Sequence, residues 1–292
     1  MSFSIVTDTS ANLPTPWLRQ HRVGIIPFTY TFDGKPANCL DTEAFDGAAF
    51  YGSMRNGGLV STSQINPQAY IDCFAPLLDA GEDILFIGMS SGISGSYQSA
   101  ELAARQLRES YPDRKIYTVD TLGASLGEGI WVMKAVEWRD EGVTLDEIAD
   151  RLLKQRQNMF QIFVVDDLMF LKRTGRVSGA AALVGTILQI KPLLKGNERG
   201  EIVTCGKAHG RRKAIEALAK HYDELVEHAE AQTVGIAHAD CAQDAEHLAA
   251  LLRRNHPPKD ILTVMYEPVT GSHVGPDTLA LFFLGGDDVR VR

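Results

Sequence analysis

The sequence predicts an α/β protein made of two α/β domains with mainly parallel sheets. Short apolar runs alternate along the chain with amphipathic segments of about 10–20 residues, which is the spacing of βαβ units. The length of 292 residues is long for one domain and comfortable for two. Hydrophobic residues make up 45% of the chain and charged residues 23%, the proportions of an ordinary globular protein with a sizeable core.

The apolar runs predict the strands, because short runs bounded by turn-forming residues are typical of buried strands. We expect strands at residues 3–7, 25–31, 84–89 and 116–119 in the first half of the chain, and at residues 162–165, 190–194, 202–207, 233–237 and 261–266 in the second half.

The amphipathic segments predict helices at residues 14–20, 42–56, 67–80, 95–111, 124–141, 145–158, 179–188, 211–230 and 243–254. The N-termini of two of these helices can be explained by their residues. Thr144 and Glu147 have the spacing of a capping box, in which each side chain binds the backbone N–H of the other residue. Pro67 suits a first helical turn, where no backbone N–H is needed.

The helix that ends near Asn158 is the expected hinge between the domains, although no low-complexity linker marks it. We therefore expect a Rossmann-like N-terminal domain over residues 1–158 and a second α/β domain over residues 159–292. No internal repeat or coiled-coil heptad is present.

Charge and cysteine content narrow the class of protein. A net charge of −8 argues against a nucleic-acid-binding protein, which needs a positive surface. The four cysteines are scattered, with no Cys-x-x-Cys pair, which fits a reducing cytoplasm. The first residues lack the basic and apolar regions of a signal peptide. The longest uncharged apolar stretch, residues 177–190, is shorter than the roughly 20 residues that cross a bilayer.

Two segments rich in hydroxyl groups are candidate anion sites. The first, residues 61–67, contains Thr62 and Ser63 and also has the composition of a helix N-cap. The second, residues 89–99, contains Ser94, Gly95 and Ser96 and leads from an apolar strand into a helix. Small residues let backbone N–H groups approach an anion, and the helix N-terminus adds partial positive charge. The second segment therefore favours a carboxylate or another anion.

The second half of the chain adds three candidates. His273 lies in a segment framed by Gly271, Gly275 and Pro276, which we expect to be a loop. Asp166 and Asp167 end a strand, but adjacent carboxylates on a strand point to opposite faces, so a helix-capping role is favoured over a metal site. Arg176, next to Gly175, is a candidate for contact with an anion or a partner.

Seven segments together resemble the DegV family of fatty-acid-binding proteins along the whole chain. They are residues 5–10 (Ile-Val-Thr-Asp-Thr-Ser), 61–64 (Ser-Thr-Ser-Gln), 90–99 (Ser-Ser-Gly-Ile-Ser-Gly-Ser-Tyr-Gln-Ser), 119–120 with 124–127 (Val-Asp and Ala-Ser-Leu-Gly), 165–168 with 171–176 (Val-Asp-Asp-Leu and Leu-Lys-Arg-Thr-Gly-Arg), 190–195 (Ile-Lys-Pro-Leu-Leu-Lys) and 273–276 (His-Val-Gly-Pro). No single motif identifies the family, but the order and spacing of the seven segments along the chain make the resemblance specific.

The resemblance implies a lipid-binding protein that is not an enzyme by itself. It implies one long-chain fatty acid, such as palmitate, stearate or oleate, in an apolar tunnel between the two domains, with no other cofactor and no metal. A separate dihydroxyacetone-kinase-like fatty acid kinase would act on the carboxylate and form an acyl phosphate for lipid metabolism. We also expect transient contact with a membrane and none with nucleic acid.

The resemblance also assigns residues. Thr62 and Ser94 correspond to the residues that touch the carboxylate, with Ser63, Gly95, Ser96 and His273 beside them and Arg176 near the mouth of the site. The helix over residues 179–188 offers candidates for the tunnel lining, and a core role fits them equally well: Ala180, Ala181, Leu183, Val184, Ile187 and Leu188.

One segment departs from the family pattern. His209 stands where family members often carry an arginine, in a basic stretch with Arg211 and Arg212. We expect a partner to dock there, although the start of a solvated helix has the same composition. The substitution leaves the identity of any kinase open.

Two enzyme alternatives remain. Residues 92–96 nearly match the Gly-x-Ser-x-Gly turn of serine hydrolases, and Ser94, Asp167 and His273 follow the chain order of that triad, but Ser96 replaces the last glycine. A phosphotransferase using Asp8 lacks both a second aspartate two positions on and a phosphate-binding Walker loop.

Overall fold

The computed structural model describes residues 2–177 and 190–291, and the chain divides into two compact units. Unit 1 comprises Met1–Phe45 and Ser61–Arg156, and unit 2 comprises Asp46–Val60 and Gln157–Arg292. The later boundary lies two residues before the expected position. The sequence did not predict that residues 46–60 belong to the second unit. The predicted helix 179–188, with its six candidate tunnel residues, lies outside the described residues.

Unit 1 is built on a parallel sheet, as the sequence predicts, and the structure gives its strand order as β2-β1-β6-β7. The strands are β1 (Phe3–Asp8), β2 (Gly24–Ile26), β6 (Asp83–Gly88) and β7 (Ile116–Asp120). Every residue of β6 is buried, as expected for a central strand covered on both faces. The order β2-β1-β6-β7 places β1 and β6 at the centre, so their carboxyl ends lie at the same edge of the sheet.

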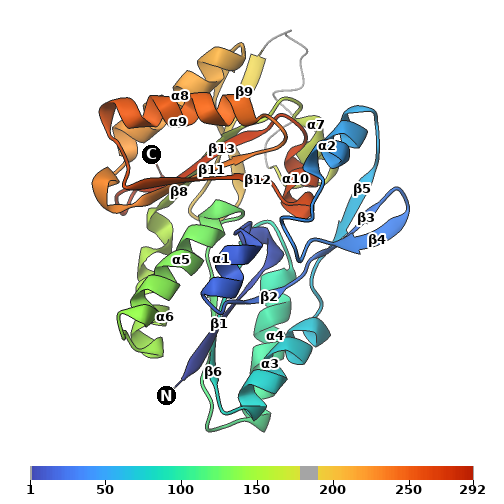
Figure 1. Ribbon diagram of the computed structural model, residues 1–292, viewed down its shortest axis with the longest axis vertical. Helices are drawn as coiled ribbons and strands as arrows, with labels where there is room; N and C mark the ends of the chain where they lie inside the picture. The colour runs from blue at the N-terminus through green and yellow to red at the C-terminus, as the bar shows by residue number, and fades with distance from the viewer. Residues whose placement is uncertain (1, 178–189, 292) are drawn as a thin grey trace. The chain divides into compact units, whose positions relative to one another are not determined.

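The helices of unit 1 pack in pairs on this sheet. Figure 1 shows α3 (Pro67–Asp79) beside α4 (Ser96–Ser110), and α5 (Leu126–Asp140) beside α6 (Leu145–Gln155) on the opposite face. The short α1 (Thr15–Gln20) precedes β2. The capping box of Thr144 and Glu147 is confirmed at the start of α6, and Pro67 begins α3.

A small sheet in the order β4-β3-β5 was only partly predicted. It contains β3 (Thr29–Phe32), β4 (Lys35–Asn38) and β5 (Val60–Ser63). The single strand predicted over residues 25–31 is wrong, because Pro27 separates β2 from β3, and proline has no N–H to donate to a ladder. Strand β5 overlaps the hydroxyl-rich segment 61–67, where no strand was predicted because the Ser-Thr-Ser sequence is polar.

Unit 2 contains a six-stranded sheet in the order β10-β9-β8-β13-β11-β12. The strands are β8 (Met159–Val164), β9 (Ile190–Gly196), β10 (Ile202–His209), β11 (Thr233–His238), β12 (Asp260–Met265) and β13 (Leu279–Leu284). Of these pairs only β11 and β12 are parallel, so the expectation of mainly parallel strands is wrong for this sheet. Two features make the pairing antiparallel. Strand β13, which was not predicted, lies between β8 and β11 and runs antiparallel to both, and a short turn joins β9 and β10 into a hairpin.

Helices α8 (Arg211–Leu225) and α9 (Ala242–Asn255) lie side by side against this sheet (Figure 1). They contribute to a buried cluster with the central strands, including Leu218, Leu248 and Phe283. None of the helices in the described ranges is long and apolar enough to cross a bilayer.

Helix α2 (Gly47–Arg55), from the early part of the chain, is bound firmly within unit 2. The buried Tyr51 hydroxyl donates to the carbonyl of Tyr266 at 2.8 Å. Arg55 forms ion pairs with Asp240 at 2.6 Å and with Asp277 at 2.8 Å. Both aspartates have a positive φ, so the guanidinium stabilises two left-handed turns at once.

Gly271→Ala is expected to destabilise unit 2 by about 2 kcal/mol, through overpacking against Tyr51. Gly271 lies in α10 (Pro268–Val274), and a Cβ there would meet the Tyr51 hydroxyl oxygen at 1.9 Å. Chemical denaturation measures the loss. The Tyr51→Phe change removes that oxygen, so the double variant should lose less than the two single losses combined. If the stability losses of the two single variants add up in the double variant, the proposed contact between residue 271 and the Tyr51 hydroxyl would be contradicted.

Candidate functional site

The two hydroxyl-rich segments of unit 1 lie against each other. A serine loop, which we define as residues 89–95, follows β6 and leads into α4. Thr62 is a half-buried residue of β5, and Ser94 and Gly95 are half-buried in the loop, whereas Ser63 is exposed. A Cβ at Gly95 would lie 2.2 Å from Oε1 of Gln64, so the Gln64 side chain covers the loop at this glycine.

The serine loop is anchored by its own backbone and by the end of β7. The N–H of Ser94 donates to the carbonyl of Ser90 at 3.2 Å, and the N–H of Ser90 donates to the carbonyl of Gly123 at 2.8 Å. The N–H of Ser91 donates to the carboxylate of Asp120 at 3.2 Å. These hydrogen bonds fix the backbone of the loop and therefore the position of the Ser94 Cα and Cβ atoms.

Ser96 joins the serine loop to the segment after β5. Its hydroxyl oxygen accepts the N–H of Ile65 at 3.0 Å and lies 3.0 Å from the hydroxyl oxygen of Ser94. The N–H of Ser96 donates to the Ser94 oxygen at 3.2 Å. The structure thus brings Ser94 and Ser96 together, next to the segment that carries Thr62. The helix-cap role considered for residues 61–67 falls to Asn66, whose side chain accepts the N–H of Ala69.

Two carboxyl groups are fully buried near the end of β1. Asp8 accepts the N–H of Ser10 at 2.8 Å, and the Ser10 hydroxyl lies 2.5 Å from Asp8 and 2.6 Å from Glu128. Thr7 donates to the other oxygen of Glu128 at 2.9 Å. Burial raises the pKa of Asp8 to about 6, against the lowering effect of its bonds from Ser10 and Met89. Asp8 also accepts the N–H of Met89, at the start of the serine loop.

Sequence reasoning missed this carboxyl pair. Asp8 was considered only as a phosphotransferase residue, and Glu128 was not considered. A signal was present, because Glu128 lies in a helix among the buried residues Leu126, Ile130 and Trp131, where an unpartnered charge would be costly.

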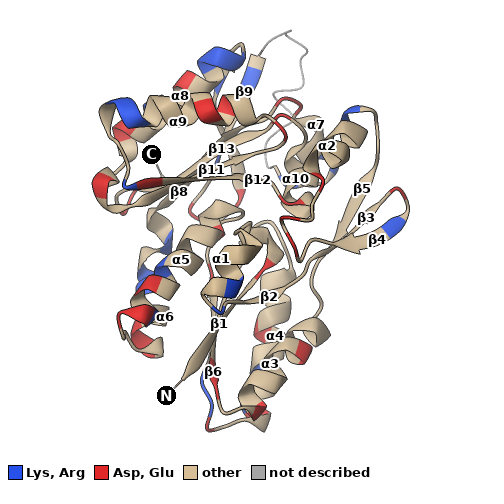
Figure 2. Cartoon of the chain, viewed as in Figure 1, with Lys and Arg blue, Asp and Glu red and all other residues tan. Residues whose placement is uncertain are grey.

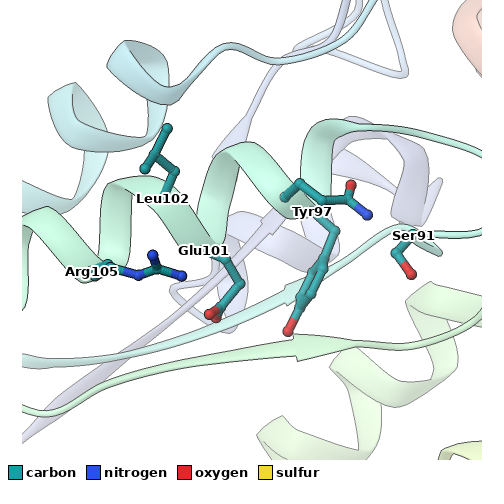
Figure 3. Close-up of a pocket in the computed structure, with 6 residues that line it drawn as sticks. Ser91, Tyr97, Glu101, Leu102 and Arg105 are labelled. Carbon is teal, nitrogen blue, oxygen red and sulfur yellow. The ribbon is translucent and has the colours of Figure 1, made fainter.

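An open pocket of about 350 Å³ lies on the outer side of α4. Figure 3 shows the residues that line it, Ser91, Tyr97, Gln98, Glu101, Leu102 and Arg105. The Tyr97 hydroxyl lies 3.4 Å from the Thr118 side chain on β7. Neither Thr62 nor Ser94 lines this pocket, so it is separate from the hydroxyl groups described above.

In unit 2, His273 occupies the helix α10 and not the loop that the sequence predicts. The Pro at the start of α10 and the side chain of Glu267, which accepts two backbone N–H groups, explain why a helix forms here. Burial, and then the positive charge of Arg176, lower the pKa of His273 to about 4. The imidazole is therefore neutral at pH 7.

Asp166 and Asp167 have structural roles. Asp167 accepts the N–H of Met169 at 2.8 Å, at the start of α7 (Met169–Arg173), which is the capping role that the sequence favours. Asp166 pairs with Lys191. Within residues 2–177 and 190–291, no group of three or more His, Cys, Asp or Glu residues is arranged to hold a metal ion.

The candidate partner surface lies where β10 ends and α8 begins. His209 is exposed at the end of β10, Arg211 pairs with Asp244 at 2.8 Å, and Arg212 pairs with Glu216 at 3.1 Å. Figure 2 shows acidic and basic residues side by side on α8 and α9. This surface is therefore mixed in charge.

Comparison with known proteins identifies relatives over nearly the whole chain. The family model described as "Uncharacterised protein, DegV family" matches residues 2–285. A DegV domain-containing protein of Clostridium perfringens is 38% identical over 97% of both chains.

Solved structures have the same fold. One of them, a DegV family protein from Thermus thermophilus whose fatty acid binding is described, has a TM-score of 0.88 and 30% identity, covering 98% of this chain and 100% of the other. DegV of Bacillus subtilis, described as a fatty acid binding protein, has a TM-score of 0.84 and 26% identity, with the same coverage. The resemblance found in the sequence motifs is confirmed, and the chain belongs to the DegV family.

Proposed function

We propose that this protein binds one long-chain fatty acid and holds its carboxylate with the hydroxyl groups of Thr62 and Ser94. The observation that supports the proposal is the close association of the serine loop with the segment after β5, through Ser96 and Gln64. The Thermus thermophilus and Bacillus subtilis relatives are described as fatty acid binding, which supports this class of ligand.

The chemistry of the segment suits a carboxylate. Ser94 precedes α4, a helix of 15 residues whose N-terminus carries partial positive charge. Neutral hydroxyl groups hold an anion without the desolvation cost of a buried ion pair. Each buried CH₂ of an acyl chain contributes about 0.8 kcal/mol, so a sixteen-carbon chain gains on the order of 10 kcal/mol before entropic costs.

Other residues take supporting roles in this proposal. Ser63 and Gly95 lie beside Thr62 and Ser94 in sequence, and the proposal also includes His273 and Arg176 as ligand-binding residues. A neutral His273 can donate or accept one hydrogen bond without adding charge.

The proposal gives the protein the role of a carrier and not of an enzyme acting alone. A separate kinase would phosphorylate the bound fatty acid to an acyl phosphate, docking at His209, Arg211 and Arg212. Ser94 serves as a hydrogen-bond donor here, and its hydroxyl is bonded to Ser96. Labelling of Ser94 by a fluorophosphonate, with turnover of an activated ester, would favour the serine hydrolase instead.

The double variant Thr62→Ala, Ser94→Ala is expected to bind palmitate at least about 100-fold more weakly while remaining folded, because each of the two lost hydrogen bonds to a charged group contributes roughly 1.5–3 kcal/mol. Titration calorimetry measures the affinity, and circular dichroism checks the fold. Ser110→Ala, an exposed serine at the other end of α4, is the matched control and should bind normally.

Native mass spectrometry provides a second measurement. The wild-type protein should retain one fatty acid through gentle purification. Protein that carries no lipid and does not bind added palmitate or oleate would contradict the proposed function. Unchanged affinity in the double variant would contradict only the position of the carboxylate.

A further inference from the structure

Asp120 is a buried residue that holds the serine loop from the neighbouring strand. It is the last residue of β7 and is only 5% exposed. In the pairing of β6 with β7 it lies opposite Gly88. Gly88 is the residue immediately before the serine loop, so this pairing brings Asp120 to the start of the loop.

One oxygen of Asp120 accepts two backbone N–H groups. Its Oδ1 atom accepts the N–H of Ser91 at 3.2 Å and the N–H of Leu122 at 2.9 Å. Leu122 has a φ of 55°, so the second hydrogen bond stabilises a left-handed turn that residues other than glycine rarely adopt. The same oxygen therefore joins the serine loop to the turn that follows β7.

The hydrogen bond to Ser91 bears on the position of Ser94. The N–H of Ser94 donates to the carbonyl of Ser90 at 3.2 Å, so residues 90–94 form a single turn of the loop. The N–H of Ser90 donates to the carbonyl of Gly123 at 2.8 Å, in the turn after β7. Without the Asp120 acceptor the N–H of Ser91 loses its partner, and the middle of the loop is held less firmly.

Asp120 also brings a negative charge close to a site that is proposed to bind an anion. Within residues 2–177 and 190–291 its carboxylate forms no ion pair with a Lys, Arg or His side chain. The guanidinium of Arg156 donates instead to the backbone carbonyl of Asp120 at 2.8 Å.

The size of this charge effect follows from the distance. Ser94 is three residues after Ser91, and three residues span at most about 11 Å, so the Ser94 backbone lies within about 14 Å of the Asp120 carboxylate. Two like charges about 12 Å apart, at an effective dielectric constant of about 20, repel enough to weaken binding about tenfold. Salt and the nearby Arg156 reduce this to about fivefold.

We propose that Asp120 is a positioning residue with two separable effects on ligand binding. Its acceptor oxygen holds the serine loop in the ligand-binding conformation, and its negative charge lowers the affinity for an anionic headgroup. The inference rests on the proposed function. It goes beyond that function because it assigns a determinant of headgroup affinity to a residue outside the proposed ligand contacts. Such a charge helps a carrier to release its ligand, because a repelled carboxylate leaves more readily.

Asp120→Asn separates the two effects, because asparagine keeps an acceptor oxygen and loses the charge. At a pH where palmitate is ionised, this variant should bind palmitate about fivefold more tightly than wild type does. Its affinity for hexadecan-1-ol should stay within about twofold of wild type, since the alcohol has no charge for Asp120 to repel. Titration calorimetry measures both affinities.

Asp120→Ala removes the acceptor oxygen as well as the charge. It should bind the alcohol about tenfold more weakly, because the loop must then be ordered on binding. Its preference for palmitate over the alcohol should rise about fivefold, as in Asp120→Asn. If the alanine variant does not fold, Asp120→Glu takes its place. That variant keeps the charge and displaces the oxygen, so it should bind both ligands more weakly.

Asp83→Asn is the matched control, because Asp83 is also a buried residue with an acceptor oxygen. It is 3% exposed, and its Oδ1 atom accepts the N–H of Lys115 at 2.9 Å. Asp83 begins β6, so it lies five residue steps, or roughly 16 Å, before Gly88. Its neutralisation should leave the preference for palmitate over the alcohol at the wild-type value.

Two results would overturn the proposal for Asp120. If Asp120→Asn binds palmitate no more tightly than wild type, or gains equally for the acid and the alcohol, the charge has no role. If Asp120→Ala binds the alcohol as tightly as wild type, the oxygen does not hold the loop. Wild-type protein that fails to bind palmitate would contradict the proposed function itself, a result that is distinguishable because it needs no variant.

Discussion

Asp8→Asn is expected to remove a contribution to the stability of the wild-type protein that Asp8 makes at pH 4 and loses as the pH rises to 7. The pKa of Asp8 rises from an ordinary value of 3.8 to about 6 on folding, because its carboxyl group is fully buried. Between these values the folded state holds more protons than the unfolded state. The stabilisation is complete below pH 3.8 and is lost as the pH rises through about 6, by about 3 kcal/mol in total.

The geometry gives the reason why a proton is retained here. The Ser10 hydroxyl, which has one proton, lies within hydrogen-bonding distance of both Asp8 and Glu128. If both carboxyls were ionised, one of these two contacts would have no hydrogen atom. Retaining one proton on the pair satisfies both contacts and leaves only one buried charge.

The measurement is the free energy of unfolding by urea at several pH values. Wild-type stability relative to Asp8→Asn should fall by about 3 kcal/mol between pH 4 and pH 7. Comparing the two proteins at each pH cancels any constant cost of the substitution. Asp113→Asn, which changes an exposed carboxylate, is the control and should follow the wild-type profile. Parallel profiles for wild type and Asp8→Asn would show that folding does not raise the pKa of Asp8.

His273→Gln should have the opposite effect on the pH profile. The pKa of His273 falls from 6.5 to about 4 on folding, because burial and the charge of Arg176 disfavour the imidazolium. Below pH 6.5 the unfolded state takes up the proton first. The stabilisation is complete above pH 6.5 and is lost as the pH falls through about 4, again by about 3 kcal/mol.

The same unfolding measurements test this prediction. Wild-type stability relative to His273→Gln should decrease on acidification. His228→Asn, at a side chain that is 84% exposed and has left-handed backbone, serves as the control because asparagine also tolerates that conformation. A constant difference between wild type and His273→Gln across this pH range would mean that the imidazole protonates normally in the folded protein.

These opposite contributions have a practical consequence for the wild-type protein. Asp8 belongs to unit 1 and His273 to unit 2. Their effects on the total stability nearly cancel between pH 4 and pH 6.5, so a flat wild-type profile would conceal both. Only the two variants separate them.

Most of the first sheet could be predicted from the sequence, because β1, β6 and β7 are compact apolar runs, each followed by a helix. The second sheet could not. Residues 279–284 are an apolar run buried almost throughout, and periodicity does not distinguish such a run from a buried helix. The direction of pairing depends on which strands become neighbours, and β13 pairs with β8, more than 100 residues earlier in the chain.

The candidate site was predictable to the extent that it is local. The serine loop follows an apolar strand and opens a helix, so its composition and position are visible in the sequence. The contact of Ser96 with Ile65 joins residues 31 positions apart, and the contact of Ser10 with Glu128 joins residues 118 positions apart. A local sequence pattern cannot contain pairs so far apart in the chain. The hydrogen bonds between them could therefore be identified only from the folded structure.

The placement of α2 has a consequence for synthesis on the ribosome. The chain passes from one unit to the other at residues 45/46, 60/61 and 156/157. Tyr51 and Arg55 emerge early, yet their partners Tyr266 and Asp277 follow 215 and 222 residues later. Unit 1 can complete its sheet and helices once residue 156 has emerged, whereas α2 must wait with its apolar face unburied until almost the whole chain has been made. The nascent protein therefore exposes the apolar face of α2 for most of its translation. During this period a chaperone would protect the segment from aggregation.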